Sequence, residues 1–366
     1  MKCTVNAGEL SAALRGPCDR AKGHKLIPIL NHVRCEAVGA KLVLLGHDLD
    51  SSSEATLDAE VMAPGGCAIP AEPLARLVAG LPKAVSILIE VIGTDAIIKS
   101  GRSRYKLPIM PAADMPAALS AQDGFKLNAS GSDIEQLLVR PRPTIDIKEP
   151  RTCFQGFYVH NEGGKLCSVA TNGKFLMRFS TEIDALEFRG AIIPRAAADE
   201  IIKIGTGEIT ISDRIISISA DNRIYSSKII DATFPEHYRR TIPAADIACV
   251  TVDRDAVLEC LSRLRAVGDF SGSDLIDISV GVDEMSISAT GLADGAETME
   301  VESTESKFVC LRSEHLSEAL KAMRGETLDL YIKNEREPLR IVDRSELGAI
   351  NVLMPCASKN RQAVAA

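Results

Sequence analysis

One pattern of apolar and polar positions occurs three times along the chain, at intervals of about 120 residues. Each copy has a short stretch of alternating apolar and polar residues, then a polar residue, then apolar residues spaced as on one helix face. The polar residues at the junctions are Asn6, Ser130 and Asp253. Side chains of this kind accept hydrogen bonds from free backbone N–H groups at the start of a helix. The pattern predicts a strand, a cap and an amphipathic helix in each copy.

The interior of each copy repeats as well. A second helix is predicted to follow each of the tripeptides Ile-Pro-Ala at 69–71, Ile-Pro-Arg at 193–195 and Leu-Arg-Ser at 311–313. Two strands around a turn come next, and an apolar strand that ends in proline closes each copy, at 105–111, 227–235 and 350–355. A repeat of this length has the size of a domain. We therefore expect an α+β fold of three tandem domains, 1–122, 123–246 and 247–366, with two helices and antiparallel sheets in each and a tail at 357–366.

Composition is ordinary for a chain that buries real cores. Of the 366 residues, 46% are hydrophobic and 25% are charged. The first residues lack a basic stretch followed by an apolar segment, so no secretory signal is expected. The longest apolar runs are far shorter than a membrane span. We expect a soluble, cytoplasmic protein.

Candidate chemistry is sparse. None of the ten cysteines forms a C-x-x-C pair, which favours reduced, buried thiols and leaves a thiol-dependent enzyme as the rival, if one cysteine has a basic neighbour. The segment His47 to Asp50 is either a turn or an acid–base cluster. Phosphate-binding loops, nucleophile elbows and histidines at metal-ligand spacing are absent from the sequence. We expect neither catalysis nor a metal or cofactor.

The charge pattern leaves nucleic-acid binding open. The net charge is −8, yet cations follow the first helix of each copy: Arg15, Arg20, Arg140, Arg142, Arg263 and Arg265. These cations either complement the negative end of a helix dipole or contact phosphates. With nine phenylalanines, five tyrosines and no tryptophan, the chain has few rings on which to stack single-stranded bases. Sequence-independent contact with a duplex remains possible.

Six segments, in order and with their spacing preserved, resemble the bacterial sliding clamps, the beta subunits of DNA polymerase III. They are GHDLD at 46–50, GRSRYKLPIMPAADMP at 101–116, VATNGKFL at 169–176, SKIIDATFP at 227–235, YRRTIP at 238–243 and VLMP at 352–355. The resemblance covers essentially the whole chain.

This resemblance implies a ring. Two three-domain subunits would associate head to tail around duplex DNA, with helices lining the hole and sheets forming the outer wall. The protein would be a non-catalytic processivity factor without cofactors. The polymerase III catalytic subunit, clamp-loader subunits, and other polymerases and repair proteins would insert an extended peptide into a hydrophobic cleft between the second and third domains. A second rival, besides the thiol-dependent enzyme, is a monomeric interaction scaffold with no role on DNA.

The family's functional positions carry over to this sequence residue by residue. The cleft would comprise Phe154, Thr171, Gly173, Lys174, Phe175, Leu176, Pro235, Arg240, Thr241, Pro338, Val352, Leu353, Met354 and Pro355. DNA contacts would come from Arg20, Lys22, His24, Lys25, Lys148 and Arg151. The first-domain side of the dimer interface would include Tyr105 and Leu107. The chain departs from the family pattern at His24, at Glu72, at the extra residue His237 and in the extension after Pro355.

Overall fold

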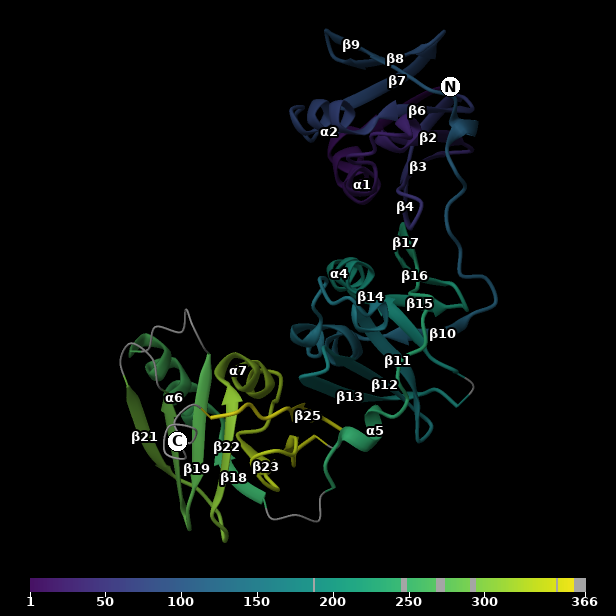
Figure 1. The fold of residues 1–366 in the computed structure, drawn as a ribbon. Helices are drawn as coiled ribbons and strands as arrows, with labels where there is room; N and C mark the ends of the chain where they lie inside the picture. Colours follow the sequence, from purple (N-terminus) through teal and green to yellow (C-terminus); the bar gives the residue numbers. More distant parts are fainter. Residues whose placement is uncertain (187, 245–248, 268–273, 290–293, 347, 359–366) are drawn as a thin grey trace. The chain divides into compact units, whose positions relative to one another are not determined.

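The computed structural model describes residues 1–186, 188–244, 249–267, 274–289, 294–346 and 348–358 (Figure 1). These residues form two compact units, one of 1–134 with 196–230 and one of 135–195 with 231–366. Every strand pair described is antiparallel, and helices and strands are interspersed, so the expected α+β class is confirmed. Within the described residues, no helix is long and apolar enough to cross a membrane.

The first unit contains two sheets. The five-stranded sheet has the order β5 (Glu60–Ala63), β1 (Lys2–Asn6), β7 (Ser86–Ile92), β8 (Asp95–Ser100), β9 (Ser103–Pro108). The eight-stranded sheet has the order β10 (Phe125–Ala129), β15 (Gly207–Ile211), β16 (Ile215–Ala220), β17 (Arg223–Lys228), β4 (Ser51–Asp58), β3 (Lys41–His47), β2 (His32–Val38), β6 (Gly65–Pro70). Its helices are α1 (Ala7–Arg20), α2 (Ala71–Ala79), α3 (Gly131–Ile134) and α4 (Arg195–Ile204), with short 3-10 turns η1 (Pro28–Asn31) and η2 (Ala112–Asp114).

The second unit is built in the same way. Its eight-stranded sheet has the order β14 (Ala191–Pro194), β11 (Gly156–Glu162), β12 (Lys165–Thr171), β13 (Phe175–Asp184), β25 (Ile350–Leu353), β24 (Leu339–Asp343), β23 (Thr327–Tyr331), β18 (Cys249–Asp253). The four-stranded sheet has the order β21 (Gly295–Glu300), β20 (Glu284–Ala289), β19 (Leu275–Val280), β22 (Lys307–Arg312). Its helical elements are the π-turn η3 (Glu135–Val139), the 3-10 turns η4 (Arg142–Thr144) and η5 (Thr152–Phe154), and α5 (Tyr238–Thr241), α6 (Arg254–Val267) and α7 (Ser313–Lys321).

All three predicted caps are present. The Asn6 side chain accepts hydrogen bonds from the N–H groups two and three residues later, at 2.8 and 3.1 Å. Ser130 and Asp133 bond reciprocally, because each side chain accepts from the other's backbone N–H, at 3.2 and 2.9 Å. Asp253 accepts from the N–H three residues on, at 2.7 Å. The predicted second helices are also confirmed, as α2, α4 and α7.

The second copy differs from the other two in its first helix. After four α-helical residues the chain widens into the π-turn η3, and the N–H of Arg140 donates to the carbonyl of Glu135. Pro141 and Pro143 follow, and proline lacks the N–H that a longer helix needs. The helix is therefore much shorter than the fourteen residues of α1 and of α6.

All three predicted closing strands end early, and the one expected at 350–355 stops at Leu353. The strand expected at 227–235 stops at Lys228, where its pairing with β4 and β16 ends. The strand expected at 105–111 stops at Pro108. β9 ends at a proline, Pro108, which has no N–H with which to continue the sheet ladder.

Each unit packs two long helices onto its sheets. In the first unit, Leu10 and Leu14 of α1 and Leu74 of α2 are at most 2% exposed, and α1 lies against β3 and β4. In the second unit, Leu261 of α6 and Leu316 of α7 are likewise buried in the core. Burying one such leucine contributes about 1.5–3 kcal/mol. The apolar helix faces read from the sequence therefore pack into the core of each unit.

Each eight-stranded sheet joins strands from two predicted domains. β17 pairs with β4 in the first unit, and β13 pairs with β25 in the second. The three-domain division stays a prediction. Residues 245–248, at its second boundary, and 359–366, in the predicted tail, lie outside the described residues.

Candidate functional site

A cavity of about 210 Å³ opens in the second unit. Four stretches of the sequence supply its walls: η5 with the residue before it, the end of β12 with the start of β13, the segment before and through α5, and the end of β25. Its lining residues are Arg151, Phe154, Thr171, Gly173, Lys174, Phe175, Leu176, Phe234, Pro235, His237, Tyr238, Thr241, Val352 and Met354.

The tight β12–β13 turn forms one wall. The side chain of Asn172 accepts hydrogen bonds from the N–H groups of Lys174 and Phe175, at 3.0 and 2.9 Å. Thr171 donates its hydroxyl to the carbonyl of Phe175 at 2.8 Å and accepts from the N–H of Gly173 at 3.0 Å. Gly173 has a φ of +83°, and a Cβ there would lie 3.0 Å from the Arg151 guanidinium. Glycine is therefore required at this position.

Aromatic rings form a second wall. Phe234 stacks on Tyr158 with ring centroids 4.7 Å apart and meets Phe154 edge-on at 5.8 Å. The side chain of Tyr238 lies edge-on to Phe234 at 5.9 Å. All but Tyr158 are buried. Offset and edge-on ring pairs of this kind add about 0.5–1.5 kcal/mol beyond their buried area, so this wall is rigid.

The third wall exposes apolar surface. Met354 is 41% exposed although its N–H donates to the carbonyl of Lys174 at 2.9 Å. Val352 and Leu176, which pair across β25 and β13, are 4% and 5% exposed. A methionine held by its backbone with a free thioether side chain can adjust to an incoming apolar group.

Basic side chains surround the apolar floor. The guanidinium of Arg151 lies 4.4 Å from the ring centroid of Phe154 and pairs with Glu149 at 2.5 Å. Lys174 and His237 are exposed at the rim. The cavity therefore offers an apolar interior with positive charge at its mouth, which suits an extended peptide with apolar anchors.

Ten of the fourteen predicted cleft residues line this cavity. The remaining four do not: Arg240, Pro338, Leu353 and Pro355. Leu353 is 1% exposed and belongs to the core around α6 and α7. Four lining residues were not among the predicted cleft set: Arg151, Phe234, His237 and Tyr238. Phe234 lies in the resembling segment SKIIDATFP, from which only Pro235 was carried over to the cleft.

The residues predicted to contact DNA have different environments. Arg20 is largely enclosed, with ion pairs to Asp48 at 3.6 Å and Glu200 at 3.4 Å. Lys22 pairs with Asp19 at 2.5 Å but remains exposed. Lys25 and Lys148 are exposed, as is Arg151, while His24 is half-buried.

The structure also shows where the predicted interface residues, the segment His47 to Asp50 and the ten cysteines lie. Tyr105 is 37% exposed and Leu107 is half-buried; both lie on β9, an edge strand of the five-stranded sheet. The segment His47 to Asp50 is a turn in which Asp48 accepts from the N–H of Asp50 at 3.0 Å. All ten cysteines are free and seven are buried, as expected.

Comparison with known proteins agrees with this architecture. The family model for the N-terminal domain of the DNA polymerase III beta subunit matches residues 1–120, and that for the central domain matches 131–236. The beta sliding clamp of Caulobacter vibrioides is 26% identical over 97% of this chain and 99% of its own length. That of Escherichia coli is 23% identical over the same shares.

Solved structures match over the same span. The pol III beta of Caulobacter crescentus has a TM-score of 0.89 at 26% identity, covering 98% of this chain and 100% of the other. A DNA polymerase sliding clamp from Pseudomonas aeruginosa has a TM-score of 0.90 at 23% identity, with the same coverage. The chain belongs to the family of DNA polymerase III beta subunits, the beta sliding clamps.

Proposed function

We propose that this protein is a sliding clamp that encircles duplex DNA and tethers a replicative polymerase to it. The observation that carries the proposal is the match to beta sliding clamps over 97% of this chain and 99% of theirs. Topology retains such a clamp on DNA, so its contacts with phosphates need only be weak and sequence-independent. The family's members are non-catalytic polymerase subunits, which agrees with the expectation that this is not an enzyme.

The cavity in the second unit is proposed as the docking site for partner peptides. Its apolar interior is lined by Leu176, Val352 and Met354 and backed by the aromatic wall. The partners proposed are the polymerase III catalytic subunit, clamp-loader subunits, and other polymerases and repair proteins that carry a clamp-binding peptide. An extended peptide with a leucine and an aromatic anchor matches a pocket of this character.

The DNA-facing residues are proposed to be Lys22, Lys25 and Lys148, together with His24. Arg20 is better suited to holding the end of α1, since two carboxylates already compensate its charge. Arg151 is better suited to the cleft, where it covers Phe154. Both arginines also form ion pairs within the chain.

The subunits are proposed to form a head-to-tail homodimer through edge strands. β9 is one edge of its sheet and bears the exposed Arg104; β21 is an edge in the second unit and bears the exposed Glu300. Unlike charges favour pairing of β9 with β21 over pairing of either edge with its own copy. We further propose three clamp domains with the boundaries predicted above, and a location in the cytoplasm.

Sedimentation equilibrium tests the assembly. The proposal predicts a particle of twice the 39.2 kDa chain mass at micromolar concentration. A chain that stays monomeric at all concentrations would support the scaffold alternative and contradict the ring.

A further inference from the structure

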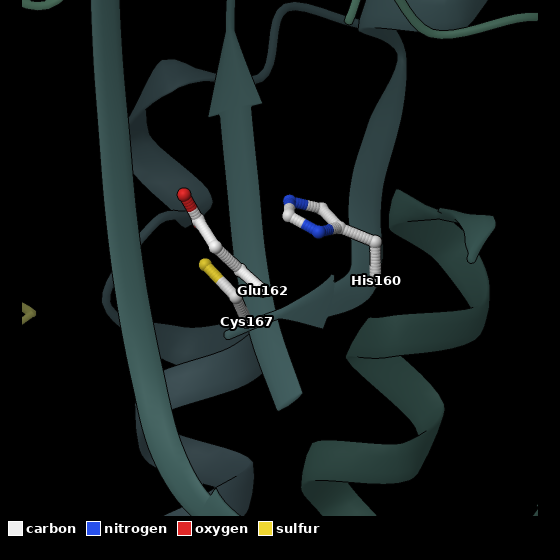
Figure 2. Close-up of side chains that lie close together, drawn as sticks. All are labelled: His160, Glu162 and Cys167. Atoms are coloured by element: carbon white, nitrogen blue, oxygen red, sulfur yellow. The ribbon is translucent and has the colours of Figure 1, made fainter. Parts of the chain in front are cut away.

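The hairpin of β11 and β12 brings together three side chains that can bind a metal. His160 and Glu162 are two positions apart on β11, so they point to the same face of the sheet. Cys167 on β12 is the direct cross-strand partner of His160. Figure 2 shows the imidazole turned toward the carboxylate and the thiol. One ligand atom from each residue lies within 4.8 Å of the other two.

The imidazole already has the orientation of a metal ligand. Nδ1 of His160 lies 2.9 Å from the carbonyl oxygen of Asn161. Because a carbonyl only accepts, Nδ1 carries the proton, and the lone pair is on Nε2. That nitrogen lies 2.9 Å from the hydroxyl of Tyr238, which donates to it. Histidines that bind metals usually donate their other N–H to a carbonyl or carboxylate in this way.

The cluster is enclosed but has one accessible member. His160 is 1% exposed and Cys167 is 0% exposed, whereas Glu162 is half-buried. Burial raises the pKa of the Cys167 thiol to about 12, so the thiol is protonated when no metal is bound.

Two arginines hold that carboxylate from the outside. Arg178 donates to Glu162 at 2.8 Å, and Arg239 lies 3.5 Å from its other oxygen. Their positive charges disfavour a bound cation. The net charge of the site nevertheless rises by only one unit, because the divalent ion displaces the proton of the Cys167 thiol. Carboxylates that bind metals are commonly hydrogen-bonded by outer groups in this manner.

We propose that His160, Glu162 and Cys167 bind one thiophilic divalent cation of the zinc class. Imidazole, carboxylate and thiolate are the ligand types that Zn²⁺ takes in proteins, and three protein ligands leave one position for water. On binding, the Cys167 S–H bond breaks, a sulfur–metal bond forms and the proton passes to the buffer. The Tyr238 hydroxyl, 3.4 Å from Glu162, then donates to the carboxylate in place of Nε2.

Cobalt(II) titration of the reduced, metal-stripped full chain tests the proposal. We expect one cobalt per chain, visible bands of tetrahedral cobalt and a near-ultraviolet sulfur-to-cobalt charge-transfer band, all removed by zinc. Cys167→Ser should abolish the charge-transfer band, and His160→Gln should lower affinity at least tenfold. Cys356→Ser, a half-buried thiol elsewhere, is the matched control and should bind as wild type does.

A second variant keeps the test decisive if substitution of the buried ligands unfolds the chain. Glu162→Gln changes the half-buried ligand but keeps an amide oxygen that can accept from Arg178; it should weaken cobalt binding at least tenfold, while circular dichroism without metal should still show a folded chain. The proposal would be overturned if Cys167→Ser or Glu162→Gln bound one cobalt per chain as tightly as wild type. It would also be overturned if the wild-type protein bound no cobalt.

Discussion

At the residue scale, two neighbours at the end of β25 have opposite roles. Leu353 is 1% exposed within the core of α6 and α7, while Met354 is 41% exposed and lines the cleft. Alternation along a strand sends successive side chains to opposite faces. The resemblance assigned both to the cleft, because a motif aligns positions and does not distinguish the two faces of a strand.

This pair gives the first prediction. Met354→Ala should weaken binding of a Gln-Leu-x-Leu-Phe peptide by roughly 1–2 kcal/mol, because it removes apolar pocket contacts, and should leave the free energy of unfolding near wild type. Leu353→Ala should instead lower the free energy of unfolding by about 2–5 kcal/mol through a core cavity. Calorimetry and urea unfolding measure the two effects. If Met354→Ala binds normally, or destabilises as Leu353→Ala does, the cleft has been placed wrongly.

Asp343 gives a prediction about pH. Its buried side chain accepts hydrogen bonds from the hydroxyl and N–H of Ser345 and from the N–H groups of Gly325 and Arg324. Burial alone would raise the pKa of this carboxyl, but the hydrogen bonds outweigh it and the pKa is lowered. A lowered folded-state pKa stabilises the fold above the unfolded value near 3.9 and loses that contribution as pH falls toward the folded value.

Asp343→Asn should therefore lower the free energy of unfolding at pH 7 by about 1–3 kcal/mol. The difference between wild type and variant should shrink as the pH falls below 4. Urea unfolding from pH 7 to pH 3 measures it. A difference that stays constant across this range would show that the carboxylate charge contributes nothing.

At the element scale, the sequence predicted most of what is local. Asn6, Ser130 and Asp253 start helices because each has a side chain suited to the free N–H groups there. The joining of β13 to β25 was not predictable in this way, since periodicity carries no information about which strands pair. The sequence also did not predict that His160 and Cys167 lie opposite each other. Their pairing depends on the register of the β11–β12 hairpin, which periodicity does not determine.

The edge strand β9 carries the third prediction. Leu107→Asp, or the more exposed Tyr105→Asp, should place a charge in the proposed dimer contact and yield monomers, because an unpaired buried charge is costly. Leu107 also packs on the core of the first unit, so the Tyr105 variant separates dimer loss from unfolding. Met62→Asp is the matched control, since Met62 is 49% exposed on β5, the other edge of the same sheet. Sedimentation should show a dimer for the control; dimers of both β9 variants would remove β9 from the interface.

At the scale of the whole molecule, an acidic chain that holds DNA by enclosure needs few cations. The net charge of −8 argues against tight electrostatic binding and agrees with a ring that slides. The prediction of a ring came from the resemblance to the sliding clamps. Composition and periodicity alone do not distinguish a ring from a monomeric scaffold.

The fourth prediction follows from this account. Lys22→Gln, Lys25→Gln and Lys148→Gln together should weaken association with duplex DNA and lower its salt slope by up to about 0.9 per lost phosphate contact. The loss should be equal for unrelated duplex sequences. Lys41→Gln with Lys99→Gln, which changes lysines on sheet strands β3 and β8, is the control and should leave the slope unchanged. A loss confined to some sequences would indicate base readout.

Retention on circular DNA tests the central claim most directly. Labelled protein is loaded by a clamp loader onto a nicked circular plasmid, separated from free protein by gel filtration, and the plasmid is then cut once. Enclosure predicts that the protein stays with the circle at high salt and leaves within minutes of linearisation, when it slides off the ends. Protein that stays on the linear DNA, or that salt removes equally from both forms, would contradict the sliding clamp.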